Sequence, residues 1–314
     1  IDYTGGGCPH ILAEPQRTNE VTYSEDFSSW SSGTSYVTSD YSISPDGTQN
    51  ASRCLFTNSN QSLSIPTSLG TSVEANGSIY IKGNSGETIQ IAVGGVDKLI
   101  TLTNDWQRYD ATKTSVNSQF NVNTWGSTTA RDFQIWGAQL EIGSYPTSLI
   151  PTSGSAVTRN KDIFTRDGIG SLINSTEGVL FVEMAALSDD GTSRLISLSD
   201  GTNTKRINIY YNISSNSIYG LLLNSSVQGI TSFALSDSTN FAKIAFKYKE
   251  NDFALWVNGT EVDTDSSGTT FTSDTLNKLS FDRADGVARF YGKVKQLQVF
   301  KTALTDTQLA ALTS

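Results

Sequence analysis

Short segments in which apolar and polar residues alternate recur along the whole chain, with turn residues between them. A period of two is the pattern of a half-buried β-strand. In RDFQIWGAQLEI (131–142), for example, Phe133 and Ile135 share one face. Many short strands spaced about 8–12 residues apart are typical of β-sandwiches. The sequence therefore predicts an all-β chain.

Two turns can be predicted from local residues. The alternating segments 78–82 and 88–93 are separated by GNSG (83–86), which predicts a hairpin. Asn258-Gly259 lies between the apolar run 253–257 and the segment that starts at Thr260. Both turn residues tolerate a positive φ, so this is the strongest hairpin signal in the chain.

One helix is predicted, at the C-terminal end. Thr305 and Gln308 have the spacing of a capping box, and Leu304, Leu309 and Leu312 can pack the helix on a sandwich. Elsewhere the many Ser, Thr and Asn residues and the 26 Gly disfavour long helices. We therefore expect a short C-terminal helix in an otherwise β-structured chain.

The 314 residues suggest two domains, at roughly 150 residues per domain. The stretch YPTSLIPTSGSAVT (145–158) has no periodicity and contains two Pro, as expected of a connector. We predict domains at 1–150 and 161–314, with the connector at 151–160.

The composition excludes several classes of protein. A net charge of −9 argues against binding to nucleic acid, which requires clustered Lys and Arg. No run of about 18 apolar residues exists, so no membrane insertion is expected.

Cys8 and Cys54 can form one bridge or remain two reduced thiols. His10 is the only histidine, which disfavours His-rich zinc sites and most Ser-His-Asp schemes. Because the chain starts at Ile1, we expect it to be a piece of a longer protein.

Both halves of the chain resemble known families. Residues 1–30, 44–51 and 133–159 resemble a module of predicted tail and structural proteins of marine phages. Within that region, the surroundings of Trp106 and the QLE–G–PTS–IPT stretch are similar to jelly-roll carbohydrate-binding modules. The second half resembles a concanavalin A-like (laminin-G-like) lectin domain, through STEGVLFVEMA (175–185), FALWVNGTEV (253–262), FYGKVKQLQVF (290–300) and ALTDTQLAAL (303–312). The resemblance implies two tandem β-sandwiches, jelly-roll-like and then concanavalin A-like, in a virion tail or on an extracellular surface.

Aromatic residues are the main candidates for binding a glycan, because the apolar face of a sugar stacks on a flat ring. Phe120 and Val122 share a strand face, whereas Trp125 has the opposite parity and follows Asn123. Trp125 and Asn123 are therefore candidate ligand contacts. Tyr210 and Tyr211 point to opposite faces, so that one is expected to be exposed, and we take Tyr210 as the candidate. Trp256, just before the Asn-Gly turn, belongs to the core or to a binding groove.

Acidic residues supply two further candidates. Asp189, Asp282 and Asp285 lie in Asp- and Gly-rich turns, and many laminin-G-like domains bind calcium at the sandwich rim. Ordinary turns are the alternative, because Asp and Gly are common turn residues. Glu261-Val262-Asp263-Thr264-Asp265 is similar to the E-x-D-x-E run of glucan hydrolases on the concanavalin-like fold. Its position directly after the Asn-Gly turn favours a solvated hairpin edge instead.

These observations predict non-catalytic recognition of a cell-surface polysaccharide by the distal part of a phage tail fibre or a comparable adhesin. Homo-oligomerisation, as a trimer, is expected because weak sites gain avidity by multivalency. A glycan-cleaving enzyme and a purely architectural virion protein are the alternatives.

Overall fold

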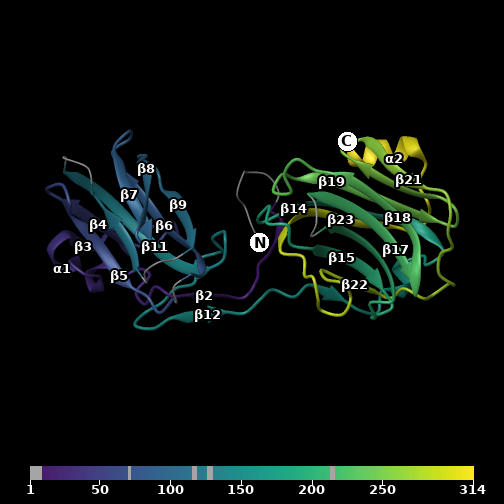
Figure 1. Cartoon of the computed structure of the whole chain (residues 1–314), viewed down its shortest axis with the longest axis horizontal. Coiled ribbons are helices and arrows are strands. Elements are labelled where there is room, and N and C mark those ends of the chain that lie inside the picture. The colour runs from purple at the N-terminus through teal and green to yellow at the C-terminus, as the bar shows by residue number, and fades with distance from the viewer. Residues whose placement is uncertain (1–8, 70–71, 115–118, 126–129, 213–215) are drawn as a thin grey trace. The chain divides into compact units, whose positions relative to one another are not determined.

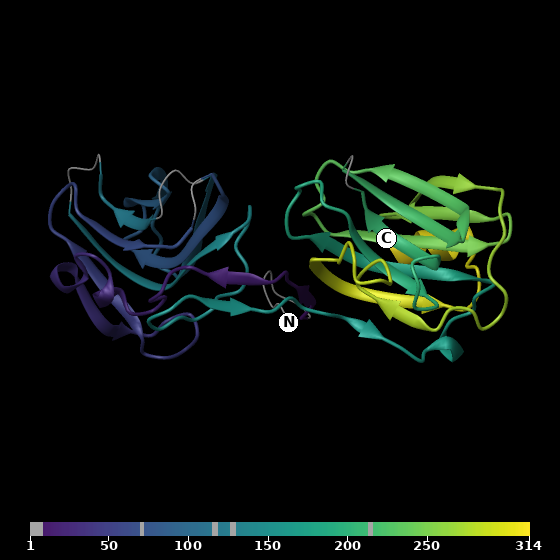
Figure 2. The same cartoon turned by 60° about the horizontal axis from the view of Figure 1, so that its bottom comes forward.

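The computed structural model describes residues 9–69, 72–114, 119–125, 130–212 and 216–314. The chain divides into two compact units, which Figures 1 and 2 show from two directions. The central unit is Gln16–Lys161, and the terminal unit is Asp162–Ser314 together with the chain up to Pro15. Strands dominate both units, so the predicted all-β class is confirmed.

Two sheets enclose the core of the central unit. One has the strand order β3-β4-β11-β6-β9 and the other has the order β5-β10-β7-β8. Apolar side chains such as Ile79, Phe120 and Phe133 are fully buried in this core. The elements are β2 (Arg17–Asn19), η1 (Phe27–Ser29), α1 (Gly33–Tyr36), β3 (Val37–Ser42), β4 (Ala51–Phe56), β5 (Ser62–Pro66), β6 (Glu74–Gly83), β7 (Thr88–Val93), β8 (Val96–Thr101), β9 (Gln107–Thr114), β10 (Gln119–Asn123), β11 (Arg131–Ile142) and β12 (Val157–Arg159), which pairs with β2.

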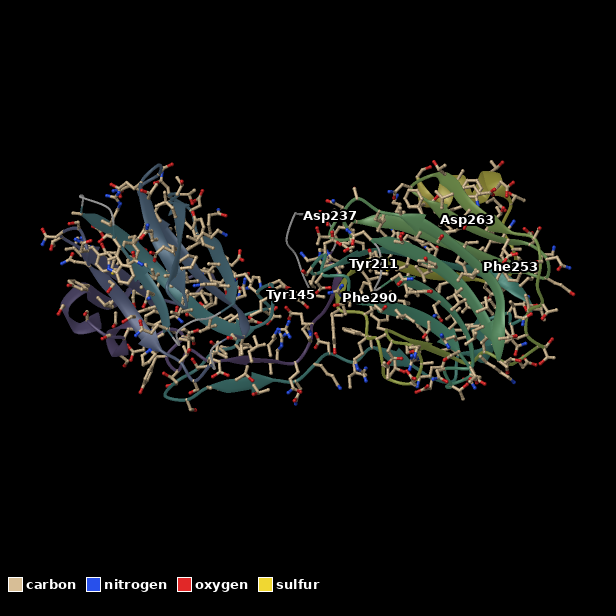
Figure 3. The ribbon with its side chains drawn as sticks, viewed as in Figure 1. Tyr145, Tyr211, Asp237, Phe253, Asp263 and Phe290 are labelled. Atoms are coloured by element: carbon tan, nitrogen blue, oxygen red, sulfur yellow. The ribbon has the colours of Figure 1, made fainter. Side chains whose placement is uncertain are left out.

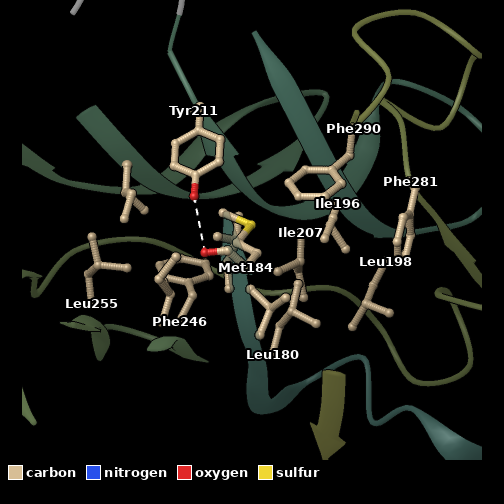
Figure 4. Close-up of a cluster of buried hydrophobic side chains, with 14 of the residues drawn as sticks. Leu180, Met184, Ile196, Leu198, Ile207, Tyr211, Phe246, Leu255, Phe281 and Phe290 are labelled. Atoms are coloured by element: carbon tan, nitrogen blue, oxygen red, sulfur yellow. Dashed lines mark hydrogen bonds between the residues drawn. The ribbon is translucent and has the colours of Figure 1, made fainter. Parts of the chain in front are cut away.

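The terminal unit also consists of two sheets around one core. Their strand orders are β1-β23-β14-β19-β20-β21 and β13-β22-β15-β16-β17-β18. Figure 4 shows Leu180, Met184, Phe246 and Phe290 in this core, where the hydroxyl of Tyr211 donates to the backbone oxygen of Met184 (3.4 Å). The elements are β1 (Ile11–Ala13), β13 (Thr165–Arg166), η2 (Gly170–Leu172), β14 (Glu177–Ala186), β15 (Arg194–Ser199), β16 (Lys205–Tyr211), β17 (Ser217–Asn224), β18 (Ser226–Ala234), β19 (Ala242–Lys249), β20 (Phe253–Val257), β21 (Thr260–Asp265), β22 (Lys278–Ser280), β23 (Gly292–Phe300) and α2 (Asp306–Thr313).

The predicted C-terminal helix is confirmed as α2 and covers one sheet from outside. Thr305 and Gln308 form the expected capping box. Leu309 is fully buried and packs with Phe181 and Trp256, on the face of the sheet that points away from the main core. Both faces of β14 and β20 are therefore buried, one against the opposite sheet and one against α2. No helix among the described residues is long and apolar enough to cross a membrane.

Of the two predicted hairpins, the structure contains one. β20 and β21 pair across Asn258 and Gly259, whose φ values are 49° and 85°. The predicted hairpin of residues 78–82 with 88–93 is wrong, because β6 and β7 belong to different sheets. The loop between them bonds instead to the chain that follows β8, where Gly86 N donates to Leu102 O (3.1 Å) and Leu102 N donates to Glu87 O (2.7 Å). A Gly-rich loop can thus cross between sheets as well as close a hairpin.

The first strand folds with the terminal unit. Ile11–Ala13 pairs with Val294–Gly292 of β23, and Ala13 is buried in the core of that unit. The predicted first domain, 1–150, therefore includes a strand that the structure places in the other compact unit. This pairing joins two distant parts of the chain, so local sequence patterns do not encode it.

Candidate functional site

The outer face of the sheet β5-β10-β7-β8 carries polar side chains at regular positions. Phe120 and Val122 of β10 point into the core and are fully buried. Asn121 and Asn123 alternate with them and therefore lie on the opposite face. The predicted parity of this strand is confirmed, and it places two buried amides on the side of the sheet that points away from the core.

Trp125 lies two residues after the end of β10, and its side chain is 40% exposed. Its backbone N–H donates to Oδ1 of Asn123 (3.0 Å), and Nδ2 of Asn123 donates to Oδ1 of Asp97 on β8 (3.1 Å). Asn123 itself is fully buried. Asn123 therefore positions the backbone of Trp125, while the indole and the exposed Asp97 face solvent.

Two neighbouring amides have free hydrogen-bonding capacity. Gln90 on β7 lies opposite Asn123 of β10. Asn121 lies two residues before Asn123, on the same face of that strand. Among the described residues, the buried side-chain oxygens Oε1 of Gln90 and Oδ1 of Asn121 have no hydrogen-bond partner. Buried amide oxygens are nearly always paired, so these two lack an expected partner, which a ligand hydroxyl can supply only where the groups that cover them move aside. Sequence reasoning missed both residues, because it paired residues 88–93 with the wrong strand.

The two other aromatic candidates differ in exposure. Tyr210 on β16 is half-buried and stacks on Tyr219 of β17, with ring centroids 5.3 Å apart. Trp256 on β20 is only 7% exposed and packs under α2 beside Leu309. The ring of Trp256 is thus part of an interior cluster, so it has no face free for a sugar.

The three acidic residues predicted as calcium ligands already accept hydrogen bonds from the protein. Asp189 accepts from Asn216 Nδ2 (2.7 Å) and Ser238 Oγ (2.9 Å). Asp282 accepts from Ala284 N (2.7 Å) and pairs with Arg289 (3.3 Å). Protein groups therefore already bind two of the carboxylates that a calcium ion would need as ligands.

Asp285 pairs with Arg283 (2.7 Å) and also accepts from Asn203 (3.0 Å). The Arg283 hydrogen bond is the main reason that the pKa of Asp285 falls to about 2. Within the described residues, no three His, Cys, Asp or Glu side chains gather closely enough to hold a metal ion. The donor set therefore does not fit a calcium site at Asp189, Asp282 and Asp285.

A chelator tests this directly. We expect EDTA to leave the melting temperature of the chain unchanged, because guanidinium, amide and hydroxyl groups satisfy these carboxylates. The measurement is a thermal unfolding curve with and without EDTA. A lower melting temperature in EDTA that added calcium restores would contradict it.

The run from Glu261 to Asp265 does not form a catalytic pair of carboxylates. A bulge in β21 places Glu261 opposite Trp256 and Asp263 opposite Leu255. Directly opposite residues share a face, so Glu261 and Asp263 point to different sides of the sheet. A retaining glycosidase needs its two carboxyl groups only about 5 Å apart.

Asp263 and Asp265 instead cap the edge of the other sheet (Figure 3 labels Asp263). Asp263 Oδ2 accepts from the backbone N–H of Ser232 (2.8 Å), and Asp265 Oδ2 accepts from that of Ile230 (3.3 Å), both on β18. An edge strand with unpaired N–H groups invites aggregation. The two aspartates therefore have a structural role at this edge.

The cap gives a pH prediction. Burial acts to raise the pKa of Asp265, but hydrogen bonds from the Ser267 and Ile230 backbone outweigh it and lower the pKa. Because the pKa of Asp265 is lower in the folded state, its ionised form stabilises the fold at pH values above the unfolded-state pKa of about 3.9. This stabilisation is lost as the pH falls through the folded-state pKa. We expect the melting temperature of Asp265→Asn to fall less than that of the parent when the pH is lowered below about 4. Equal acid sensitivity of the variant and the parent would contradict this.

Cys54 is a free, fully buried thiol in the core of the central unit. Burial raises the pKa of Cys54, so the unreactive thiol form dominates. Cys8, the other member of the bridge considered from the sequence, lies outside the described residues.

Comparison with known proteins gives the fold of the terminal unit. Residues 179–310 match the family model described as the concanavalin A-like lectin/glucanases superfamily. The terminal unit contains a concanavalin A-like domain. No curated protein matches the chain.

Three solved structures illustrate the structural likeness. The CBM40 of the Ruminococcus gnavus IT-sialidase, bound to alpha2,6 sialyllactose, has 16% identity and a TM-score of 0.38, over 48% of this chain and 98% of that one. Domains LG4-5 of the mouse laminin alpha1 chain have 12% identity and a TM-score of 0.32, over 79% and 89%. Sheep galectin-11 in complex with glycerol has 10% identity and a TM-score of 0.31, over 45% and 99%.

Proposed function

We propose that this chain recognises a cell-surface glycan without cleaving it, as the distal part of a phage tail fibre or a comparable adhesin on a virion or an extracellular surface. The observation that carries the proposal is the outer face of β5-β10-β7-β8. There an exposed Trp125 lies at the end of β10, on the sheet that holds the unpartnered amide oxygens of Gln90 and Asn121. The concanavalin A-like, lectin-type domain of the terminal unit supports the same function.

The chemistry of this face suits a saccharide. A sugar ring offers an apolar face that stacks on an aromatic ring, and hydroxyl groups that need amide or carboxylate partners. The indole of Trp125 supplies the first, while Gln90, Asn121 and the exposed Asp97 supply the second. The site needs no proton transfer and no metal ion for this task.

Shallow sites of this kind bind weakly. We expect dissociation constants near the millimolar range, about 4 kcal/mol of binding free energy. Several linked copies can raise the avidity by roughly 10²–10⁴. A homo-oligomer, for which we propose a trimer, would supply those copies on a fibre.

A glycan array with the full chain tests the function. We expect binding to a subset of bacterial or algal polysaccharides, together with no rise in reducing ends when the bound polysaccharides are incubated with the protein. A rise in reducing ends would replace the proposal by a glycan-cleaving enzyme. Binding to no glycan at all would support an architectural virion protein instead.

A further inference from the structure

A second polar face lies on β16 of the terminal unit. Ile207 and Ile209 point into the core and are fully buried. Arg206, Asn208 and Tyr210 alternate with them and share the outer face. At about 3.3 Å per residue, the row from Arg206 to Tyr210 extends for roughly 13 Å. The row is therefore long enough for a short oligosaccharide.

Asn208 has an unsatisfied amide at the middle of this row. Its side chain is 0% exposed, and neither Nδ2 nor Oδ1 has a hydrogen-bond partner among the described residues. Its neighbours across the strands are Ser197 and Leu221. The hydroxyl of Ser197 is 2.5 Å from the backbone oxygen of Asp282, to which it donates. A buried amide without any partner is costly, which points to a partner outside the protein.

Arg206 carries a positive charge that no ion pair neutralises within the described part of the chain. Burial is the main cause of its lowered pKa, and Arg283 adds to it. The nearby carboxylate, Asp285, is hydrogen-bonded to Arg283 and Asn203. A half-buried guanidinium without an ion pair can bind a carboxylate or sulfate group through charge-assisted hydrogen bonds.

Two aromatic rings complete the row. Tyr210 and Tyr219 stack with an interplanar angle of 25°, and both are half-buried. Ser232 lies opposite Tyr219 on β18, so the strand beside the stack carries only a small side chain there. Arg206 and Tyr210 make no hydrogen bond through their side chains to other described residues. Both are thus free to reorient and admit a hydroxyl to Asn208.

We propose that Arg206, Asn208 and the Tyr210–Tyr219 stack form a second saccharide site, which selects an acidic glycan carrying carboxylate or sulfate groups. The guanidinium binds the acidic group, the amide binds hydroxyls, and the tyrosines contact the ring. A free inorganic anion would use only Arg206. Nucleic acid is disfavoured by the adjacent Asp285 and by the net charge of −9, because binding to a phosphate backbone requires clustered Lys and Arg. The inference rests on the proposed function only in that the ligand is a glycan.

The test uses the full chain with Trp125→Ala, which silences the site of the central unit. Titration calorimetry measures binding of hexagalacturonate, of its carboxyl-reduced form and of a sulfated galactan oligosaccharide, with inorganic sulfate as competitor. We expect Arg206→Gln to weaken binding of the acidic oligosaccharides by about tenfold or more, as for a charge-assisted hydrogen bond. Arg166→Gln, an exposed arginine of the same unit, is the matched control and should change nothing.

A second variant separates binding from folding. Asn208→Leu keeps the branched shape of the side chain, so we expect it to raise the melting temperature and yet weaken binding of the acidic oligosaccharides. The proposal is overturned if Arg206→Gln binds as the parent does, if the carboxyl-reduced form binds as well as hexagalacturonate, if inorganic sulfate competes at equal concentration, or if no acidic oligosaccharide binds. Each of these results leaves the proposed function open to its own test, the binding of glycans by the chain with Trp125 intact.

Discussion

Replacing Trp125 by alanine is expected to remove detectable glycan binding by the central unit while the chain stays folded. Trp residues at binding hot spots contribute about 2 kcal/mol or more, which is roughly a 30-fold change in affinity. A site near the millimolar range would then bind too weakly to be measured. The indole is 40% exposed, so its removal leaves no cavity in the core.

The matched control is Tyr41→Ala. Tyr41 is 48% exposed and belongs to the central unit as well, but it lies on β3 of the other sheet, beside Arg53. Calorimetry with a glycan chosen from the array should show binding by the parent and by Tyr41→Ala, and none by Trp125→Ala. Unchanged affinity of Trp125→Ala would show that the indole makes no ligand contact.

A buried polar network holds the segment after β11 on the central unit. Glu141 accepts from the backbone N–H of Thr147 (3.0 Å) and from its hydroxyl (2.9 Å), and it forms an ion pair with Arg17 (3.3 Å). Gln139 also donates to Glu141 and accepts from the backbone N–H of Ile150 (2.6 Å). The QLE–G–PTS–IPT stretch noted in the sequence is therefore a structural motif: its polar residues bond its own two halves together.

Glu141→Ala is expected to destabilise the central unit strongly. Removing the buried carboxylate costs about 3 kcal/mol, because the backbone N–H and the hydroxyl of Thr147 lose their acceptor and the partly exposed Arg17 loses its ion pair. For a unit of this size, that lowers the melting temperature by roughly 10 °C. Differential scanning calorimetry measures the change, with Glu74→Ala as the control, since Glu74 is exposed at the start of β6. Equal melting of Glu141→Ala and the parent would contradict the role of the network.

Local patterns in the sequence predicted local features well. The alternation through Phe120 and Val122 gave the correct faces of β10. The turn at Asn258-Gly259 and the capping box at Thr305 follow from residues only a few positions apart. Each of these features depends on backbone geometry that neighbouring residues determine.

Features that depend on distant pairing could not be predicted in this way. Trp256 alternates with Leu255, but both faces of its strand are buried, one of them by α2 from the end of the chain. Gln90 and Asn121 meet on one face only because β7 pairs with β10, not with β6. The bulge that separates Glu261 from Asp263 is likewise a property of the paired strands.

An NMR titration of the full chain with a bound glycan from the array tests whether the face around Trp125 holds a saccharide intact. The account predicts saturable shifts of the Trp125 indole N–H and of the side-chain amides of Gln90 and Asn121, with unchanged signals of the oligosaccharide over time. An indole resonance that stays in place at saturation, or the appearance of cleavage products, would contradict it.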